Sequence, residues 1–269
     1  MYINKKPIRR SRIRIYLGKK YYTFKRYLQW YCGKKKYSHI KGQNELKYLV
    51  YSHKTPLLRR LRNVDMYLQY NKINNLKIAG SKINKIIVNP METFSYWKLI
   101  GKPTYKKGYF DGLVLCPNGS FNKDVGGGLC QLSNLIYWMA LHTPLTVVER
   151  YRHSHDVFPD VNRFQPFGSG ATCVYNYLDL QIYNNTKSKY QIIVYLKGKY
   201  LEGQIRSNNS CVYKYEVYEK NQSITSGYYG GYIRNNSIWR KVYDKRNEII
   251  RDEYITENHA IMMYNPLVK

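Results

Sequence analysis

The chain lacks the features that would place it at once in a membrane, disulfide-rich or metal-binding class. It has no run of 18 apolar residues, so the sequence predicts no helix that spans a membrane. Its five cysteines are widely spaced and form no C-x-x-C pair, which argues against a disulfide framework and against a zinc cluster. We therefore expect a protein of a reducing cytoplasm that uses neither a metal nor a cofactor.

Acidic residues are also scarce. The chain has 17 Asp and Glu against 45 Lys and Arg, a formal net charge of +28. Residues 1–62 hold 19 of these basic residues against the single acid Glu45, a net +18. Such an excess favours an anionic partner, either a membrane surface or a cell-wall precursor, although a solvated basic surface would look the same. Nucleic acid is not the expected partner, because no helix-turn-helix, RNA-recognition or zinc-finger signature is present.

The N-terminus MYINKKPIRRSRIRIYLGKKYY has the positive charge of a secretion signal but not its apolar core. Export by the ordinary route is therefore not expected. We expect a cytoplasmic protein that is peripheral on the inner face of the membrane if its basic region binds lipid.

A basic helical front precedes the rest of the chain. Tyr21, Phe24, Leu28 and Tyr31 are spaced 3, 4 and 3 residues apart, which fits one face of a helix, and Lys and Arg occupy the opposite face. A basic amphipathic helix suits either a membrane surface or packing on its own protein. We assign residues 1–62 to a basic, helical extension outside the sheets and residues 63–269 to an α+β domain.

The remaining pattern is typical of an α+β protein in which a cysteine-bearing helix packs on an antiparallel sheet. A helix is predicted from Cys130 to about His142, and its apolar positions form one stripe that would bury it; these positions are Leu132, Leu135, Ile136, Met139 and Ala140. Segments 145–153 and 171–183 are predicted as strands of that sheet. A papain-like or transglutaminase-like core is the more specific expectation.

The stretch DVGGGLCQLSN places Cys130 in the first turn of this helix. Free N–H groups and the helix dipole there lower the pKa of a thiol and can bind an oxyanion. Gly127 and Gly128 leave room beside the sulfur, and Gln131 follows it. A small buried cysteine under a tight turn would produce the same pattern, so both a reactive and a structural thiol stay open.

A thiol nucleophile needs a base and a group that orients the base. His153 follows on a predicted strand and Asp179 on another, with Asn176 as the alternative orienting residue. This order resembles the papain-like, transglutaminase-type arrangement. It predicts a catalytic set of Cys130, His153 and Asp179. The predicted substrate or oxyanion contacts come from four further residues, namely Gly127, Gly128, Gln131 and Asn176.

Longer segments of the chain resemble the VanW family. These are VNPMETFSYWKLIGKPT, GGGLCQLSNLIYW, VVERYRHSHDVFPDVNRFQPFGSGATCVYNYLDLQIYN and RDEYITENHAIMMYNP, and the resemblance runs roughly from Val64 to Pro266. Many relatives write the second motif G-G-G-I-C-Q-V-S-S, so Cys130 and Gln131 match it, and E-R-x-x-H-S matches at His153. Relatives often carry Asp where Gly170 stands here, so a role for that acid does not transfer.

The resemblance implies a cell-envelope or glycopeptide-resistance context in Gram-positive bacteria. Two functions remain open within it. One is a cysteine-dependent hydrolase or acyltransferase that acts on peptide or amide bonds of envelope material. The other is a non-catalytic module that binds an anionic membrane or cell-wall precursor through its basic front.

Overall fold

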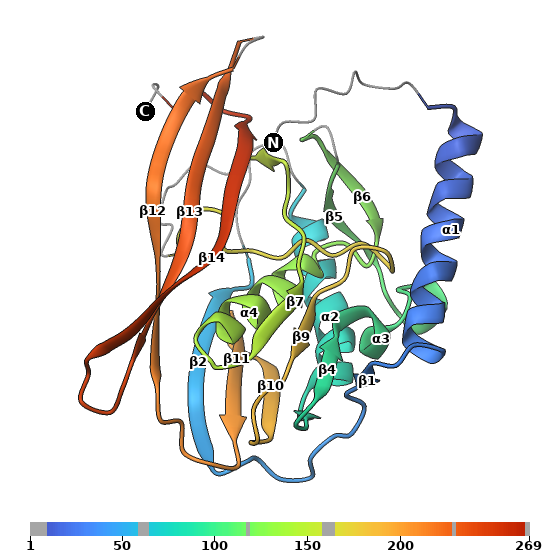
Figure 1. Ribbon diagram of the computed structural model, residues 1–269. Coiled ribbons are helices and arrows are strands. Elements are labelled where there is room, and N and C mark those ends of the chain that lie inside the picture. Colours follow the sequence, from blue (N-terminus) through green and yellow to red (C-terminus); the bar gives the residue numbers. More distant parts are fainter. Residues whose placement is uncertain (1–9, 59–64, 117–118, 158–164, 228–229, 267–269) are drawn as a thin grey trace.

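The computed structural model describes residues 10–58, 65–116, 119–157, 165–227 and 230–266. In this part of the chain the helices are α1 (Arg12–Tyr31), α2 (Met66–Ile83), α3 (Tyr96–Ile100) and α4 (Cys130–Leu141), with a 3-10 turn η1 (Tyr105–Lys107). The strands form three four-stranded sheets and one two-stranded hairpin (Figure 1). The mixed α+β class expected from the sequence is therefore confirmed.

The sheets draw on strands far apart in the chain. The first sheet has the order β1 (Lys36–Tyr37), β4 (Glu92–Ser95), β9 (Gln181–Tyr183) and β7 (Thr146–Glu149). The second has the order β2 (Tyr48–Pro56), β11 (Tyr200–Ser207), β10 (Tyr190–Lys197) and β3 (Ile86–Val88). The third has the order β12 (Lys214–Ser226), β13 (Tyr232–Tyr243), β14 (Ile249–Met262) and β8 (His155–Asp156). Strands β5 (Asp111–Leu115) and β6 (Phe121–Val125) form the hairpin.

Helix α4 is the centre of the core. It contacts β2 and β11 of the second sheet and β7 of the first (Figure 1). The predicted apolar stripe is fully buried, since Leu132, Leu135, Ile136, Met139 and Ala140 are all 0% exposed. Strand β11 carries Gly203 beneath the helix, where a Cβ would lie 2.6 Å from the methyl group of Met139. The absence of a side chain there lets the helix approach the sheet closely.

The two strands expected near α4 lie in one sheet. Strand β7 pairs antiparallel with β9, with Thr146 opposite Tyr183 and Val147 opposite Ile182. Helix α4 begins at Cys130 itself. The expectation of a helix that begins at Cys130 is confirmed. The two predicted segments share a sheet, but only residues 146–149 and 181–183 of them form strands, and this sheet also contains the parallel pair of β1 and β4.

The expected helical extension over residues 1–62 is only partly helical. Helix α1 lies outside the sheets, at one side of the molecule (Figure 1). Strand β2, by contrast, pairs antiparallel with β11 along its whole length and forms an edge of the second sheet. Its residues alternate in burial because one face packs on α4 and the other meets solvent. The predicted boundary at 62/63 falls in a stretch outside the described residues.

The described residues give no support for the papain-like or transglutaminase-like core. His153 lies in the connection between β7 and β8, and Asp179 lies two residues before β9. Neither residue is therefore within a strand beside α4, where the predicted base and its orienting group were expected.

Candidate functional site

The glycines before Cys130 accommodate other parts of the same chain. A Cβ on Gly127 would overlap the backbone carbonyl of Gly112 in β5, and a Cβ on Gly128 would overlap the side chain of Lys72 in α2. Gly126 and Gly128 also have φ angles of 78° and 88°, which favour glycine. The room that these glycines leave is therefore filled by the β5–β6 hairpin and by α2.

The Cys130 thiol faces the chain segment that precedes β9. Its sulfur donates a weak hydrogen bond to the carbonyl of Cys173 at 3.8 Å. The residue as a whole is half-buried, but the surrounding protein atoms desolvate the sulfur. This desolvation raises the pKa of the Cys130 thiol, against a smaller lowering by backbone hydrogen bonds. Desolvation thus opposes the lowering of the thiol pKa that a helix N-terminus would provide.

Asp179 is buried and its carboxylate is fully engaged. One oxygen accepts from the backbone N–H groups of Trp97 at 2.9 Å and Leu180 at 3.0 Å. The other accepts from the Ser95 hydroxyl at 2.5 Å and the Gln181 amide at 3.3 Å. Burial raises the pKa of Asp179 to about 6, opposed by the hydrogen bonds from Ser95 and Trp97. All lone pairs of this carboxylate are used, so Asp179 anchors the start of α3 and does not orient an imidazole.

His153 lies near the cysteine segment but is not connected to it. The carbonyl of Tyr151 accepts from the N–H of Thr172 at 2.8 Å, which brings this stretch beside the residues that Cys130 contacts. The His153 side chain is exposed, and among the described residues it has no hydrogen bond to Cys130 or to Asp179. No hydrogen bond joins Cys130, His153 and Asp179 in the described part of the chain, and the catalytic set stays a prediction.

The other predicted contact residues also have structural surroundings. Gln131 donates from its amide to the Thr55 hydroxyl at 2.9 Å and the Pro56 carbonyl at 2.8 Å, which fastens α4 to β2. The N–H of Gly127 donates to the Asp124 carbonyl at 3.0 Å, so it is not free for an oxyanion. Asn176 is fully buried, and neither atom of its side-chain amide has a hydrogen-bond partner.

A buried ion pair that the sequence patterns did not indicate joins α1 to the core. The Arg26 guanidinium is 6% exposed and binds both carboxylate oxygens of Glu149 at the end of β7. It also donates to the carbonyls of Asn176 at 3.0 Å and Tyr177 at 3.1 Å. Glu149 in turn accepts from the N–H of Asp179 at 3.2 Å. The available sequence signal was Trp30, an aromatic residue four positions after Arg26 on the same helix face.

The apolar stripe of α1 points away from the protein. Its exposed fractions range from 44% to 72%; the members, spaced at helical intervals of three and four, are Ile13, Leu17, Tyr21, Phe24, Leu28 and Tyr31. The inward face carries Arg26 and Trp30, which are both buried. We call the outward set the α1 stripe. A helix on a globular protein ordinarily buries such a stripe, and α1 exposes it.

Comparison with known proteins places the chain in a family. Residues 71–206, half of the chain, match the family described as "VanW like protein". The chain belongs to the VanW family. The matched residues run from α2 to the end of β11 and include Cys130, His153 and Asp179. Helix α1 and strands β12–β14 lie outside the matched part of this VanW-family chain.

Two curated relatives illustrate the reach of the match. The vancomycin B-type resistance protein VanW of Enterococcus faecalis is 35% identical over 181 residues, which is 67% of this chain and 66% of that protein. The uncharacterized protein YoaR of Bacillus subtilis is 29% identical over 114 residues, 42% of this chain and 36% of that protein. The chain thus spans just under two thirds and about one third of their lengths. No solved structure matches it significantly.

Two further features of the described residues concern membranes and metals. No helix in this part of the chain is both long and apolar enough to cross a membrane. Within the same residues, no three His, Cys, Asp or Glu side chains are grouped closely enough to hold a metal ion.

Proposed function

We propose that this VanW-family protein is a binding module that docks on an anionic membrane surface through the α1 stripe. We further propose that it acts in a cell-envelope context linked to glycopeptide resistance, because one of its relatives is named a vancomycin B-type resistance protein. The observation that carries the proposal is the outward direction of six apolar or aromatic side chains on a helix that has basic but no acidic residues.

The orientation of α1 is held by its contacts with the core. Arg26 is bound by Glu149 and two backbone carbonyls, and Lys98 donates to the Trp30 carbonyl at 2.9 Å. The hydroxyls of Tyr27 and Tyr175 are hydrogen-bonded at 2.7 Å. Turning the stripe inward would break all of these interactions. The apolar face is therefore presented to whatever lies beside the protein.

The chemistry of α1 matches an anionic lipid interface. Its apolar and aromatic residues would sit at the boundary between head groups and acyl chains, where tyrosine is favoured. The other faces of the same helix carry basic side chains, and each contributes roughly 1 kcal/mol near an anionic surface; those on α1 besides Arg26 are Arg12, Arg14, Lys19, Lys20 and Lys25. A second copy of α1 is a poorer occupant because it would bring like charges together.

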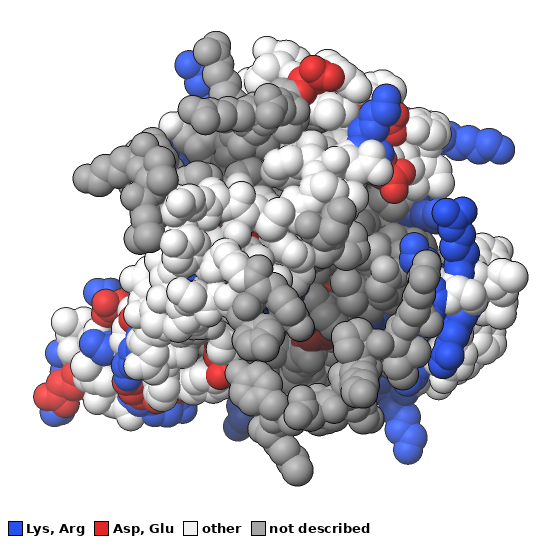
Figure 2. Space-filling model, turned by 90° about the horizontal axis from the view of Figure 1, so that it is seen from above, with Lys and Arg blue, Asp and Glu red and all other residues white. Residues whose placement is uncertain are grey.

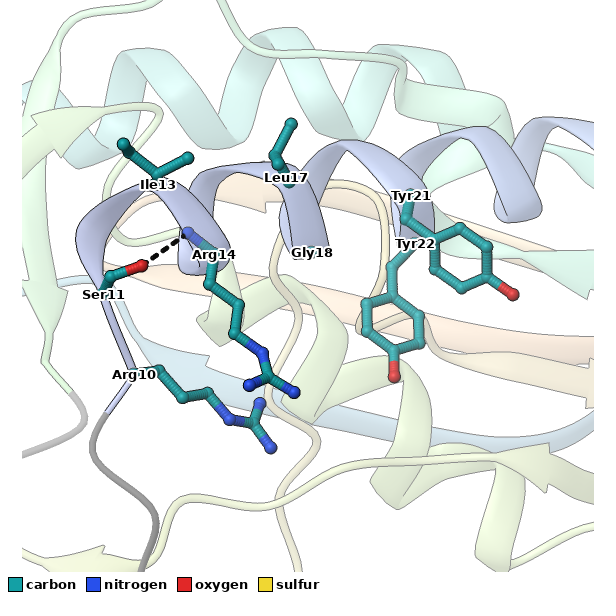
Figure 3. A pocket seen from close by; sticks show the side chains of 8 residues that line it. All are labelled: Arg10, Ser11, Ile13, Arg14, Leu17, Gly18, Tyr21 and Tyr22. Atoms are coloured by element: carbon teal, nitrogen blue, oxygen red, sulfur yellow. Dashed lines mark hydrogen bonds between the residues drawn. The ribbon is translucent and has the colours of Figure 1, made fainter.

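The figures show how this charge is distributed. In Figure 2 the blue Lys and Arg side chains gather on the side of the molecule where α1 lies, whereas on the opposite side they alternate with red Asp and Glu. Figure 3 shows the first turns of α1, where an open hollow of about 570 Å³ is lined by apolar and basic groups. Ile13 and Leu17 project to one side of the helix there, and Arg14 projects to another. Apolar contact and charge are thus offered together.

A cysteine hydrolase or acyltransferase is the weaker proposal for this chain. It would need Cys130 as a thiolate and His153 beside it, and it would need Asp179 free to orient the ring. The Cys130 pKa is raised, His153 is exposed, and the Asp179 carboxylate is fully occupied. The binding module requires no rearrangement of the described structure.

Vesicle sedimentation tests the proposal. Full-length protein should bind vesicles of phosphatidylserine and phosphatidylcholine and bind pure phosphatidylcholine weakly, with binding reduced in high salt. Leu17→Ser with Phe24→Ser should lower the affinity at least about tenfold, because two side chains that are 58% and 61% exposed lose their membrane burial. A truncation is less suitable, because it would have to retain β2.

The matched control is Ile249→Ser with Ile250→Ser. These two apolar side chains are 54% and 44% exposed at the β13–β14 hairpin, away from α1 (Figure 1). This control should bind vesicles like the wild type. Equal binding by the α1 variant and the wild type, or binding that does not depend on anionic lipid, would refute the proposal.

A further inference from the structure

A groove of about 450 Å³ lies where the third sheet joins the core. It is formed by β2, the end of α4 and the segment that leads from β11 into β12. Aromatic rings dominate its lining, which includes Tyr48, Tyr51, His142, Tyr213 and Tyr215. Of the lining residues, His142 alone lies within the residues matched by the VanW family. The groove is therefore a feature of how this chain's flanking segments meet the family core.

His142 places one unused acceptor in this groove. The residue is 8% exposed, and its Nδ1 lies 2.9 Å from the Trp138 carbonyl. A carbonyl only accepts, so Nδ1 carries the proton and Nε2 is left as the acceptor of a neutral ring. Among the described residues no donor reaches Nε2. Burial lowers the pKa of His142 to about 4, with neighbouring His53 and Arg240 acting in the same direction, so the ring stays neutral near pH 7.

The rest of the lining adds a flat surface and one positive charge. The His142 ring stacks on Tyr51 with centroids 3.9 Å apart and planes 11° apart. Tyr213 is 41% exposed at the rim, next to the exposed Lys214. Flat aromatic walls favour a planar ring. Nε2 of His142 would accept a hydrogen bond from a donor on the ligand ring, and the Lys214 ammonium would attract an anionic group on the ligand. Lys214 at the rim disfavours a cationic ligand, whereas the charge of nearby Arg240 is paired with Glu253.

We propose that this groove binds a planar aromatic carboxylate that bears an O–H or N–H donor on its ring. The ring lies against the tyrosines, the donor bonds to Nε2 of His142, and the carboxylate pairs with Lys214. The volume falls within the range of small-molecule sites in proteins, and half of the lining residues carry an aromatic ring beside polar groups that can orient a ligand. This site is separate from α1 and does not depend on membrane binding.

Three probes separate the elements of the proposed ligand. 4-Hydroxybenzoate has the ring, the donor and the carboxylate; benzoate lacks the donor; cyclohexanecarboxylate lacks the flat ring. In titration calorimetry with the full chain, 4-hydroxybenzoate should bind roughly tenfold more tightly than benzoate, a difference of ~1.4 kcal/mol. Cyclohexanecarboxylate should bind more weakly than both aromatic acids.

Variants then assign the contacts. His142→Phe keeps a stacking ring but removes the acceptor, so 4-hydroxybenzoate should bind no better than benzoate. The control His39→Phe removes an exposed imidazole whose Nδ1 also lies near a backbone carbonyl, at 3.2 Å from Tyr37, and should preserve the tenfold advantage. Lys214→Gln, at an exposed position, should weaken the binding of both aromatic acids several-fold.

The comparison of two probes in one variant makes the result decisive even if His142→Phe loses some stability, because thermal melting reports folding separately. Three outcomes would each overturn the proposal. They are no saturable binding of either aromatic acid, binding of cyclohexanecarboxylate as tight as that of benzoate, and an advantage of 4-hydroxybenzoate that survives His142→Phe.

Discussion

Replacing Arg26 by alanine removes the interaction that docks α1 on the core. The guanidinium donates to Glu149 at 2.7 Å through one nitrogen and to the same carboxylate through a second, and to the carbonyls of Asn176 and Tyr177. Without it, Glu149 would lose the charge that balances its own and would keep weaker partners, among them the Asp179 N–H and the Tyr151 hydroxyl. Breaking a buried pair by removing one partner costs about 3–5 kcal/mol.

Local detachment of α1 would limit this loss of stability. If α1 leaves the surface, Glu149 regains water, and the loss cannot exceed the free energy with which α1 is docked. The other docking contacts are the burial of Trp30 and the hydrogen bonds of Tyr27 and Lys98. We therefore expect α1 to detach locally in Arg26→Ala while the core around α4 stays folded.

Hydrogen exchange followed by mass spectrometry measures this directly. Amides of residues 12–31 should exchange at least about a hundredfold faster in Arg26→Ala, the factor that ~2.7 kcal/mol corresponds to. Amides of α4 should be unchanged. Arg14→Ala, on the exposed side of the same helix, is the matched control and should leave both regions as in the wild type. Equal exchange of α1 in Arg26→Ala and the wild type would refute a docking role for this residue.

A double substitution tests whether the pair itself is responsible. Arg26→Met with Glu149→Leu replaces both charges by apolar groups, which is often neutral for stability. It should restore most of the α1 protection that Arg26→Ala loses. If it restores none, the hydrogen bonds to the carbonyls of Asn176 and Tyr177 hold the helix and the ion pair does not.

Three further predictions concern the core around α4. In the folded protein the pKa of Asp179 is raised to about 6 from 3.8. Its contribution to the free energy of unfolding is therefore fully present below pH 3.8 and is lost as the pH rises through about 6. Asp179→Asn should remove this pH-dependent change, up to ~3 kcal/mol, when unfolding by urea is measured at both ends of the pH range. With a haloacetamide at pH 7, exposed Cys32 should react at least tenfold faster than Cys130, whose thiol pKa is raised; a Cys130 that reacts first would revive the nucleophile hypothesis. Gly127→Ala should destabilise the fold by about 1–3 kcal/mol because its Cβ would overlap the backbone of β5. Gly80→Ala lies in α2, where the new Cβ would meet Val194 at 3.9 Å, and should stabilise the fold by up to ~1 kcal/mol in the same unfolding assay.

Sequence patterns sufficed where a structure is specified locally. The start of α4 at Cys130 and its buried stripe follow from a 3.6-residue period that needs only one apolar face. The turn between β13 and β14 is also specified locally, because the Asp244 side chain accepts from the N–H groups of Arg246 and Glu248. The family was likewise evident from motifs that are continuous in the chain.

The direction of the α1 stripe was not determined by the sequence. Periodicity places Tyr21, Phe24 and Leu28 on one face, but either face of such a helix could meet the protein. The choice depends on Arg26 and Glu149, which are 123 positions apart in the chain. The membership of β2 in the second sheet is similarly non-local, because its partner β11 lies roughly 150 residues later and supplies its hydrogen bonds.

The chemistry of the cysteine region also depended on tertiary contacts. The order Cys130, His153, Asp179 along the chain is compatible with a catalytic set, because sequence order carries no distances. The fold gives the Asp179 carboxylate to Ser95 and Trp97 at the start of α3, and it closes the glycine loop against Gly112 and Lys72. The lone pairs of the Asp179 carboxylate are taken by these donors. In the described structure, β5 and α2 fill the space beside Gly127 and Gly128.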